Sequence, residues 1–144
     1  MPSQGDELAA CVQTFADRVL KLIGHLPQNP RFEHIFTQLI DSASSQSANY
    51  RAARRARSRK EFVAKIGLVA EEADESENWL EMLTRAGVAN TPARITEIAS
   101  LVVEASELRA IFVQSHQTSR ANYQRMCSEP KHQAPNRRRR RADL

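Results

Sequence analysis

The apolar residues of this chain recur every three or four positions, a pattern that predicts amphipathic helices. The first pattern covers about residues 6–26 and the second about residues 30–57, with a proline-containing break between them. Asp6 is expected to cap the first helix, and Asn29 followed by Pro30 is a typical start for the second. The expected inner faces consist of Leu8, Val12, Phe15, Val19, Leu22 and Leu26 in the first helix, and of Phe32, Ile35, Phe36, Leu39, Ile40 and Ala43 in the second.

Two further helices follow. Ser58 and Glu61 form a capping box that opens the third helix, and Gly87 suits a left-handed residue at its end. Thr91, followed by a proline, predicts the start of a fourth helix that frays over residues 119–125. The expected inner faces are Phe62, Ile66, Val69, Ala73, Ser76, Leu80 and Leu83 in the third helix, and Ile95, Ile98, Val102, Ala105, Leu108 or Arg109, and Phe112 in the fourth.

Residues 43–49 in the second helix are mostly Ala and Ser, with very small side chains. Small side chains let a neighbouring backbone come close, and a Ser hydroxyl can bond to the carbonyl four residues earlier. No Gly or Pro interrupts the segment, so it is interpreted as a tight helix crossing and not as a loop.

Four amphipathic helices with short connections predict an all-α fold, an antiparallel up-down-up-down four-helix bundle. The pattern assigns the bundle to residues 1–126. From Cys127 onward Pro, His, Gln and Arg replace the apolar residues, so residues 127–144 are expected to form a disordered, basic, Arg-rich C-terminal tail.

The positive charge of the chain is concentrated in this tail. The formal net charge of the 144 residues is +4. Residues 131–144 hold six basic side chains and one acid, a surplus of +5, which leaves −1 for the rest of the chain. The bundle itself is therefore expected to be close to neutral.

Several classes of protein lack support in the sequence. The chain does not open with a signal-peptide pattern, and no apolar run approaches the ~18 residues that span a bilayer. We expect a soluble, cytoplasmic protein without membrane contact, in which Cys11 and Cys127 are reduced thiols; a disulfide between them is the alternative. The four His residues make no catalytic triad or metal-ligand spacing, and no Gly-rich phosphate loop is present. No catalytic residue, metal or cofactor is expected.

The stretch from residue 38 to residue 83 carries motifs that resemble those of one protein family. The motifs are Gln38-Leu39, the Ser-rich segment 42–47, Ala48-Asn49-Tyr50, Ser58 to Phe62, Glu72-Ala73-Asp74-Glu75 and Trp79-Leu80-Glu81-Met82-Leu83. In these residues the chain is similar to bacterial four-helix-bundle proteins known as the 23S ribosomal RNA intervening-sequence protein family. Ala52 departs from the family's pattern, in which an acidic residue often stands at this position.

The resemblance implies a compact bundle that associates into a ring, commonly a homopentamer. It also implies kinship with the accessory variability proteins of diversity-generating retroelements, which partner a reverse transcriptase and bind nucleic acid. That kinship is an analogy at the level of the fold.

Two basic clusters are candidates for nucleic-acid binding. Six cations surround the break between the second and third helices: Arg51, Arg54, Arg55, Arg57, Arg59 and Lys60. They suit a phosphate-binding patch, or alternatively a solvated helix end that the helix dipole favours. The tail holds a run of five: Arg137, Arg138, Arg139, Arg140 and Arg141. This run suits contact with a nucleic-acid backbone without sequence specificity, and a solubilising tail is the alternative.

An acidic segment in the third helix comprises Glu71, Glu72, Asp74, Glu75, Glu77 and Glu81. No His follows at the spacing of a di-iron motif, so pairing with the basic cluster of a neighbouring subunit is the preferred interpretation. Asn49 and Glu75 are the candidates for a buried, mutually bonded polar pair. Tyr50 and Trp79 are expected to pack in the bundle or at a subunit interface, with base stacking as the alternative.

The sequence therefore predicts a non-enzymatic, homo-oligomeric four-helix bundle whose basic surface and tail bind nucleic acid, with structured RNA as the expected ligand. The competing hypothesis is a protein-interaction scaffold, for example an accessory subunit of a reverse transcriptase or a ribonucleoprotein.

Overall fold

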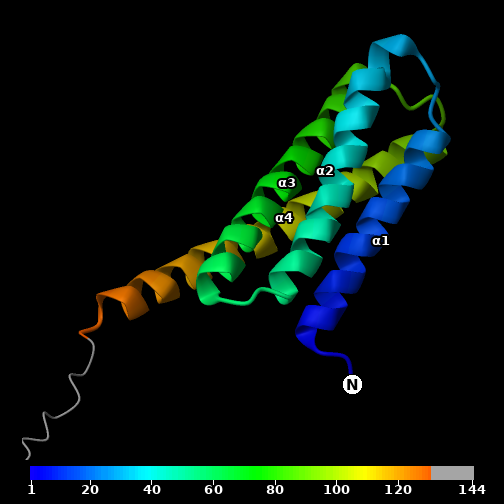
Figure 1. The fold of residues 1–144 in the computed structure, drawn as a ribbon. Helices are drawn as coiled ribbons and strands as arrows, with labels where there is room; N and C mark the ends of the chain where they lie inside the picture. The colour runs from blue at the N-terminus through cyan, green and yellow to red at the C-terminus, as the bar shows by residue number, and fades with distance from the viewer. Residues whose placement is uncertain (131–144) are drawn as a thin grey trace, which may run out of the picture.

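The computed structural model describes residues 1–130, which form four helices and no strand. The helices are α1 (Gln4–Gly24), α2 (Pro30–Arg54), α3 (Arg59–Ala86) and α4 (Pro92–Ser128). Each runs antiparallel to the one before it, in an up-down-up-down order (Figure 1). The predicted all-α four-helix bundle is confirmed. The five arginines predicted as a tail cluster lie outside the described residues.

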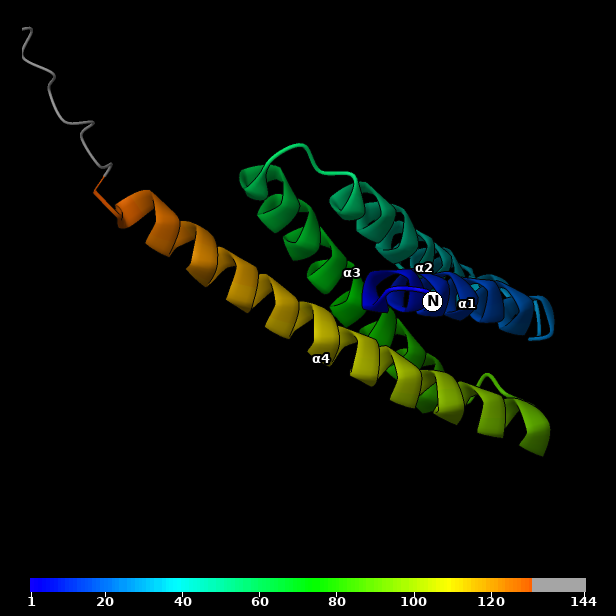
Figure 2. The same cartoon turned by 90° about the horizontal axis from the view of Figure 1, so that it is seen from below.

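Helix α3 is the central element of the bundle. It packs extensively on both α2 and α4, whereas α1 packs on α2 and touches α4 only lightly. Viewed from below, α4 diverges from the other helices and runs past the start of α3 (Figure 2). We call residues 119–128 of this helix the α4 extension. None of the helices within residues 1–130 combines the length and the apolar character needed to cross a membrane.

The helix ends follow the predicted capping residues with some corrections. Asn29, Ser58 and Thr91 cap α2, α3 and α4, and Gly87 ends α3 with a φ of 64°. Ser3 and not Asp6 caps α1, because Asp6 occupies the third helical position and closes a capping box with Ser3.

Two predicted helix ends are wrong. Helix α2 ends at Arg54, three residues before the predicted Arg57. Helix α4 continues without a break through residues 119–125 and past the predicted domain boundary at 126, as far as Ser128. No Gly or Pro stands between its first turn and Pro130, and residues such as Arg, Ala, Gln and Met propagate a helix without needing an apolar face.

The core contains most of the predicted inner positions and some that were not predicted. Leu101 is fully buried, although the predicted face of α4 omitted it, and Ile95 is 58% exposed, although that face included it. At this end of the bundle Val88, from the α3–α4 connection, is buried instead. The largest fully buried apolar side chains are Phe15, Leu22, Leu39, Ile66, Leu80, Leu83, Leu101 and Phe112.

A small polar group lies inside the contact between α2 and α3. Ser42 and Ser76 are both buried, and their hydroxyl oxygens are 3.0 Å apart. Ser42 donates to the carbonyl of Leu39, and Ser76 lies 2.9 Å from the carbonyl of Glu72. One turn further along α2, Gln46 is 1% exposed, and no group within residues 1–130 makes a hydrogen bond with its amide.

We predict that Gln46→Met stabilises the bundle. A buried amide without a partner costs about 1–3 kcal/mol, and Met has a similar length and volume without polar hydrogens. The free energy of unfolding in urea should therefore rise by about 1–3 kcal/mol. Leu39→Ala, at another buried position of α2, is the control and should lower it by about 2–5 kcal/mol. A less stable Gln46→Met protein would mean that the amide makes a stabilising bond.

Candidate nucleic-acid interface

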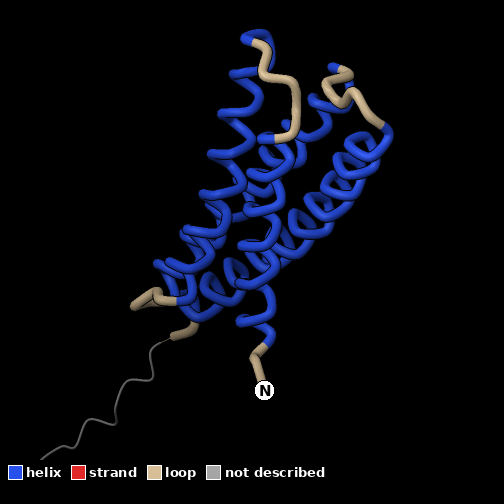
Figure 3. The backbone as a smooth tube through the Cα atoms, turned by 90° about the vertical axis from the view of Figure 1, so that its right-hand side faces the viewer, coloured by secondary structure: helices blue, strands red, loops and turns tan. Residues whose placement is uncertain are grey.

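Three segments that are distant in sequence meet at one end of the bundle. They are the start of α1, the turn between α2 and α3, and the α4 extension (Figure 3). The Tyr50 hydroxyl lies 3.5 Å from the carbonyl oxygen of Gly5, and Arg59 in α3 donates to the sulfur of Met126 in α4 over 3.0 Å. We call this the basic end, because the predicted cations of the α2–α3 turn lie here.

All six of these cations are exposed at the basic end: Arg51, Arg54, Arg55, Arg57, Arg59 and Lys60. Three of them have an acidic or sulfur partner. Arg54 pairs with Asp6 at 2.5 Å, Arg57 lies 3.9 Å from Glu61, and Arg59 bonds the Met126 thioether. Arg51, Arg55 and Lys60 have no hydrogen bond or ion pair from their side chains to any residue in the range 1–130.

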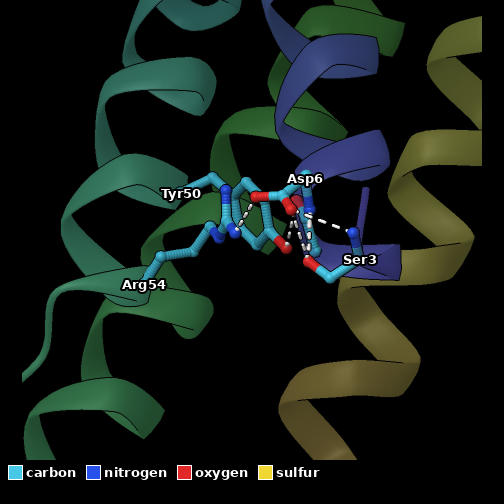
Figure 4. Close-up of polar contacts among 5 residues, drawn as sticks. Ser3, Asp6, Tyr50 and Arg54 are labelled. Atoms are coloured by element: carbon cyan, nitrogen blue, oxygen red, sulfur yellow. Dashed lines mark hydrogen bonds and ion pairs between the residues drawn. The ribbon is translucent and has the colours of Figure 1, made fainter. Parts of the chain in front are cut away.

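Arg54 serves the fold because it fastens α2 to the start of α1 (Figure 4). Its hydrogen bond, with those from the backbone and hydroxyl of Ser3, lowers the pKa of Asp6 from 3.8 to about 2. Tyr50 lies beneath this contact, and its ring packs on Phe112 with the ring centroids 5.2 Å apart. Burial raises the pKa of the Tyr50 phenol.

A cleft of about 460 Å³ separates the α2–α3 turn from the α4 extension. Its lining comprises Ala53, Arg54, Ala56, Arg57, Ser58, Arg59, Phe62, Val63, Ser119, Asn122 and Tyr123. The sequence did not predict the α4 side of this cleft, Ser119, Asn122 and Tyr123, because the helix was expected to fray over residues 119–125. Two more exposed cations, Arg120 and Arg125, belong to the same segment.

The predicted buried pair of Asn49 and Glu75 is wrong. Glu75 is exposed, Asn49 is half-buried, and no hydrogen bond joins them. The next residue of α3, Ser76, points into the bundle, so the side chain of Glu75 points to solvent. Trp79 is half-buried and packs edge-on against His34, with the ring centroids 5.7 Å apart.

The acidic segment of α3 makes a contact within the same chain. Glu77 accepts a hydrogen bond from Arg109 of α4 and forms an ion pair with it. Partial burial, and then the neighbouring Glu75, Glu71 and Asp41, raises the pKa of Glu72. Within residues 1–130 no three His, Cys, Asp or Glu side chains are grouped as metal ligands would be.

A second surface of interest lies where α1 and α4 diverge. Arg18 of α1 pairs with Glu104 and donates to Ser100 over 3.2 Å, and beside this contact a groove of about 360 Å³ opens. Apolar side chains line much of this groove, and two of them are well exposed, Val103 at 59% and Ile111 at 46%. Cys11 also lines it, and both cysteines are free and exposed.

The fold has a counterpart among solved structures. The chain is similar to a crystal structure from Bacteroides thetaiotaomicron VPI-5482, described as a protein with unknown function from the S23 ribosomal protein family. The two share 24% sequence identity with a TM-score of 0.64, over 80% of this chain and 99% of that one. This likeness shows a shared four-helix fold. No protein-family model and no curated protein matches the chain.

We predict that Asp6→Asn removes part of the acid sensitivity of folding. The pKa of Asp6 is lower in the folded state than its ordinary value of 3.8, so its ion pair stabilises the fold fully above that pH. This contribution disappears as the pH falls toward about 2. The melting temperatures of wild type and variant should therefore differ near neutrality and converge at pH 2. Asp17→Asn, at an exposed position of α1, is the control. Parallel curves for wild type and Asp6→Asn would contradict the prediction.

Proposed function

We propose that this protein is a non-enzymatic, homo-oligomeric four-helix bundle that binds nucleic acid, with structured RNA as the ligand, and that it does so with little sequence specificity. We also propose that it belongs to the 23S ribosomal RNA intervening-sequence protein family. The motifs of α2 and α3 support this membership, and so does the S23 family name of the similar structure.

One observation supports the nucleic-acid proposal: two basic segments, the α2–α3 turn and the α4 extension, lie at a single end of the bundle. The cations of the α2–α3 turn face the same end as Arg120 and Arg125 of the α4 extension. The described chain ends there at Pro130, and its sequence continues to the five arginines 137–141. Cations that neutralise phosphates release counterions, which gives affinity without sequence readout.

The electrostatic contrast along the molecule adds support. Residues 1–130 carry a formal charge close to neutral, and the acidic segment of α3, which starts at Glu71, lies away from the first turn with Arg59 and Lys60. A polyanion is therefore attracted to one end of the bundle and not to its whole surface. Four of the cations of the α2–α3 turn, Arg51, Arg54, Arg59 and Lys60, lie on helix ends, which fixes the positions of their backbones relative to an ordered phosphate backbone such as that of a folded RNA.

The homo-oligomeric part of the proposal rests on the α1–α4 groove. Val103 and Ile111 expose apolar surface beside it, and the divergence of α4 leaves the flank of α1 open. A second copy of the chain would bury this surface. The alternative function, a docking scaffold for a reverse transcriptase or ribonucleoprotein, would use the same groove for a different protein.

We predict that removing unpaired cations at the basic end lowers the salt dependence of RNA binding. The triple variant Arg51→Gln, Arg55→Gln and Lys60→Gln should reduce the slope of log affinity against log salt by about 0.7–0.9 for each phosphate that the protein no longer neutralises. Binding of a labelled RNA hairpin is measured by fluorescence anisotropy at several salt concentrations.

Its matched control is Lys21→Gln, Arg31→Gln and Arg85→Gln, which removes the same charge from exposed positions at the opposite end. A variant truncated after Pro130 keeps α4 intact. The difference between its RNA affinity and that of the full chain gives the contribution of residues 131–144 to binding. An equal decrease in both triple variants would show that only net charge matters. Absence of RNA binding near physiological salt would reject the nucleic-acid proposal in favour of the scaffold.

We predict that Val103→Glu combined with Ile111→Glu dissociates the oligomer. Burying two unpaired carboxylates beside Glu104 and Glu107 should raise the dissociation constant at least about 10-fold, since each 1.4 kcal/mol gives a factor of ten. Native mass spectrometry measures the number of 16.3 kDa subunits. Leu20→Glu, which is equally exposed on another flank of α1, is the control. A wild-type monomer would refute the oligomer.

A further inference from the structure

We propose that the cleft between the α2–α3 turn and the α4 extension binds one unpaired nucleotide of the nucleic acid. Arg57 and Arg59 hold its phosphate, and Tyr123 stacks on its base. This inference rests on the proposed function and adds to it a defined site and the single-stranded character of the ligand at that site.

The cleft has the size and walls that a nucleotide requires. Its volume of about 460 Å³ lies within the usual range of small-molecule sites, about 300–1,000 Å³. The turn and the first residues of α3 supply guanidinium groups on one side, and α4 supplies an aromatic ring and an amide on the other. Ala53, Ala56 and Val63 add apolar lining. Charged and apolar surfaces therefore face the same space, as the phosphate and the base of a nucleotide demand.

The phosphate side carries positive charge that remains available. The side chain of Arg57 is 91% exposed, and its one acidic neighbour, Glu61, is 3.9 Å away. That carboxylate already accepts a hydrogen bond from the backbone N–H of Arg57 at 3.1 Å. Arg59 bonds the neutral sulfur of Met126, which leaves its charge uncompensated. Two guanidinium groups at one edge of a cleft can bind a phosphate in the bidentate manner.

The base side carries an aromatic ring and a free amide donor. Tyr123 and Phe62 are half-buried and line the cleft from α4 and α3. Asn122 accepts a hydrogen bond from Arg125 at 3.1 Å through its oxygen, so its NH₂ group can donate to a base edge. Stacking on one aromatic side chain is sequence-tolerant, which fits a protein that binds without sequence preference.

The ligand must be unpaired at this point. A base inside a duplex has both faces covered by its neighbours, so it cannot stack on a protein ring unless it leaves the helix. The remaining cations, Arg51, Arg55 and Lys60, are available for duplex phosphates nearby. A loop or end of a folded RNA would then enter the cleft while the adjoining stem contacts the rest of the basic end.

The test compares two labelled RNAs with the same number of phosphates, a single-stranded oligouridine and a blunt duplex, both with the full chain. Tyr123→Ala should weaken oligouridine binding by about 5- to 100-fold, the effect of removing one stacked base, and change duplex binding less than about 2-fold. Tyr123→Phe keeps the ring and should bind as wild type. Arg31→Gln, far from the cleft, should leave the ratio of the two affinities unchanged.

A second measurement uses the unmodified chain and so does not depend on the folding of any variant. Oligouridine containing 5-bromouridine is irradiated with the protein, and the crosslinked peptide is identified by mass spectrometry. A crosslink within residues 119–128 or at Phe62, which also lines the cleft, is expected. A crosslink elsewhere, or an equal effect of Tyr123→Ala and Tyr123→Phe, would overturn this site while duplex binding left the proposed function intact. Absence of binding by both RNAs would overturn both.

Discussion

The close contact between α2 and α3 is the constraint on which the rest of the structure depends. Small side chains, among them Ala43 and Ala73, and the bonded hydroxyls of Ser42 and Ser76 allow these helices to approach closely. With α2 against one side of α3, the other side of α3 receives α4, and α1 packs on α2. The same hairpin brings the C-terminus of α2 and the N-terminus of α3 together, so the Arg-rich residues of both helix ends converge at one place.

The α4 extension forms the second wall of the cleft beside the α2–α3 turn. A shorter fourth helix would leave the α2–α3 turn as a convex tip, on which cations point outward into solvent. Because α4 runs past the turn, Asn122 and Tyr123 face Arg57 and Arg59 across an open space. No residue of the extension is buried, since Phe112 is the last buried residue of α4, so its place beside the turn depends on contacts such as that between Arg59 and Met126.

The helices, most of their caps and most of the core could be predicted from sequence because these features depend on local periodicity. The burial of Gln46 is also predictable from the sequence. One face of α2, with spacings of three and four, consists of Leu39, Ala43, Gln46, Tyr50 and Ala53. The predicted buried pair of Asn49 and Glu75 was based on the hydrogen-bonding capacity of the two side chains and not on which face of each helix points inward. The inner face of α4 was harder to predict. Ile95 and Leu101 are both apolar, and only the packing of α4 against its neighbours decides which of them is buried.

The cleft could not be predicted, because it depends on where α4 passes relative to a turn more than sixty residues earlier in the chain. The position of each cation on its helix nevertheless indicates which role it has. Arg51 and Arg54 lie in the last turn of α2, where the helix dipole favours positive charge, so stability alone could explain them. Arg59 and Lys60 lie in the first turn of α3, where the dipole disfavours cations by about 0.3–1 kcal/mol each. A bound phosphate would reverse this penalty, since the N-terminus of a helix and its cations then attract the same anion.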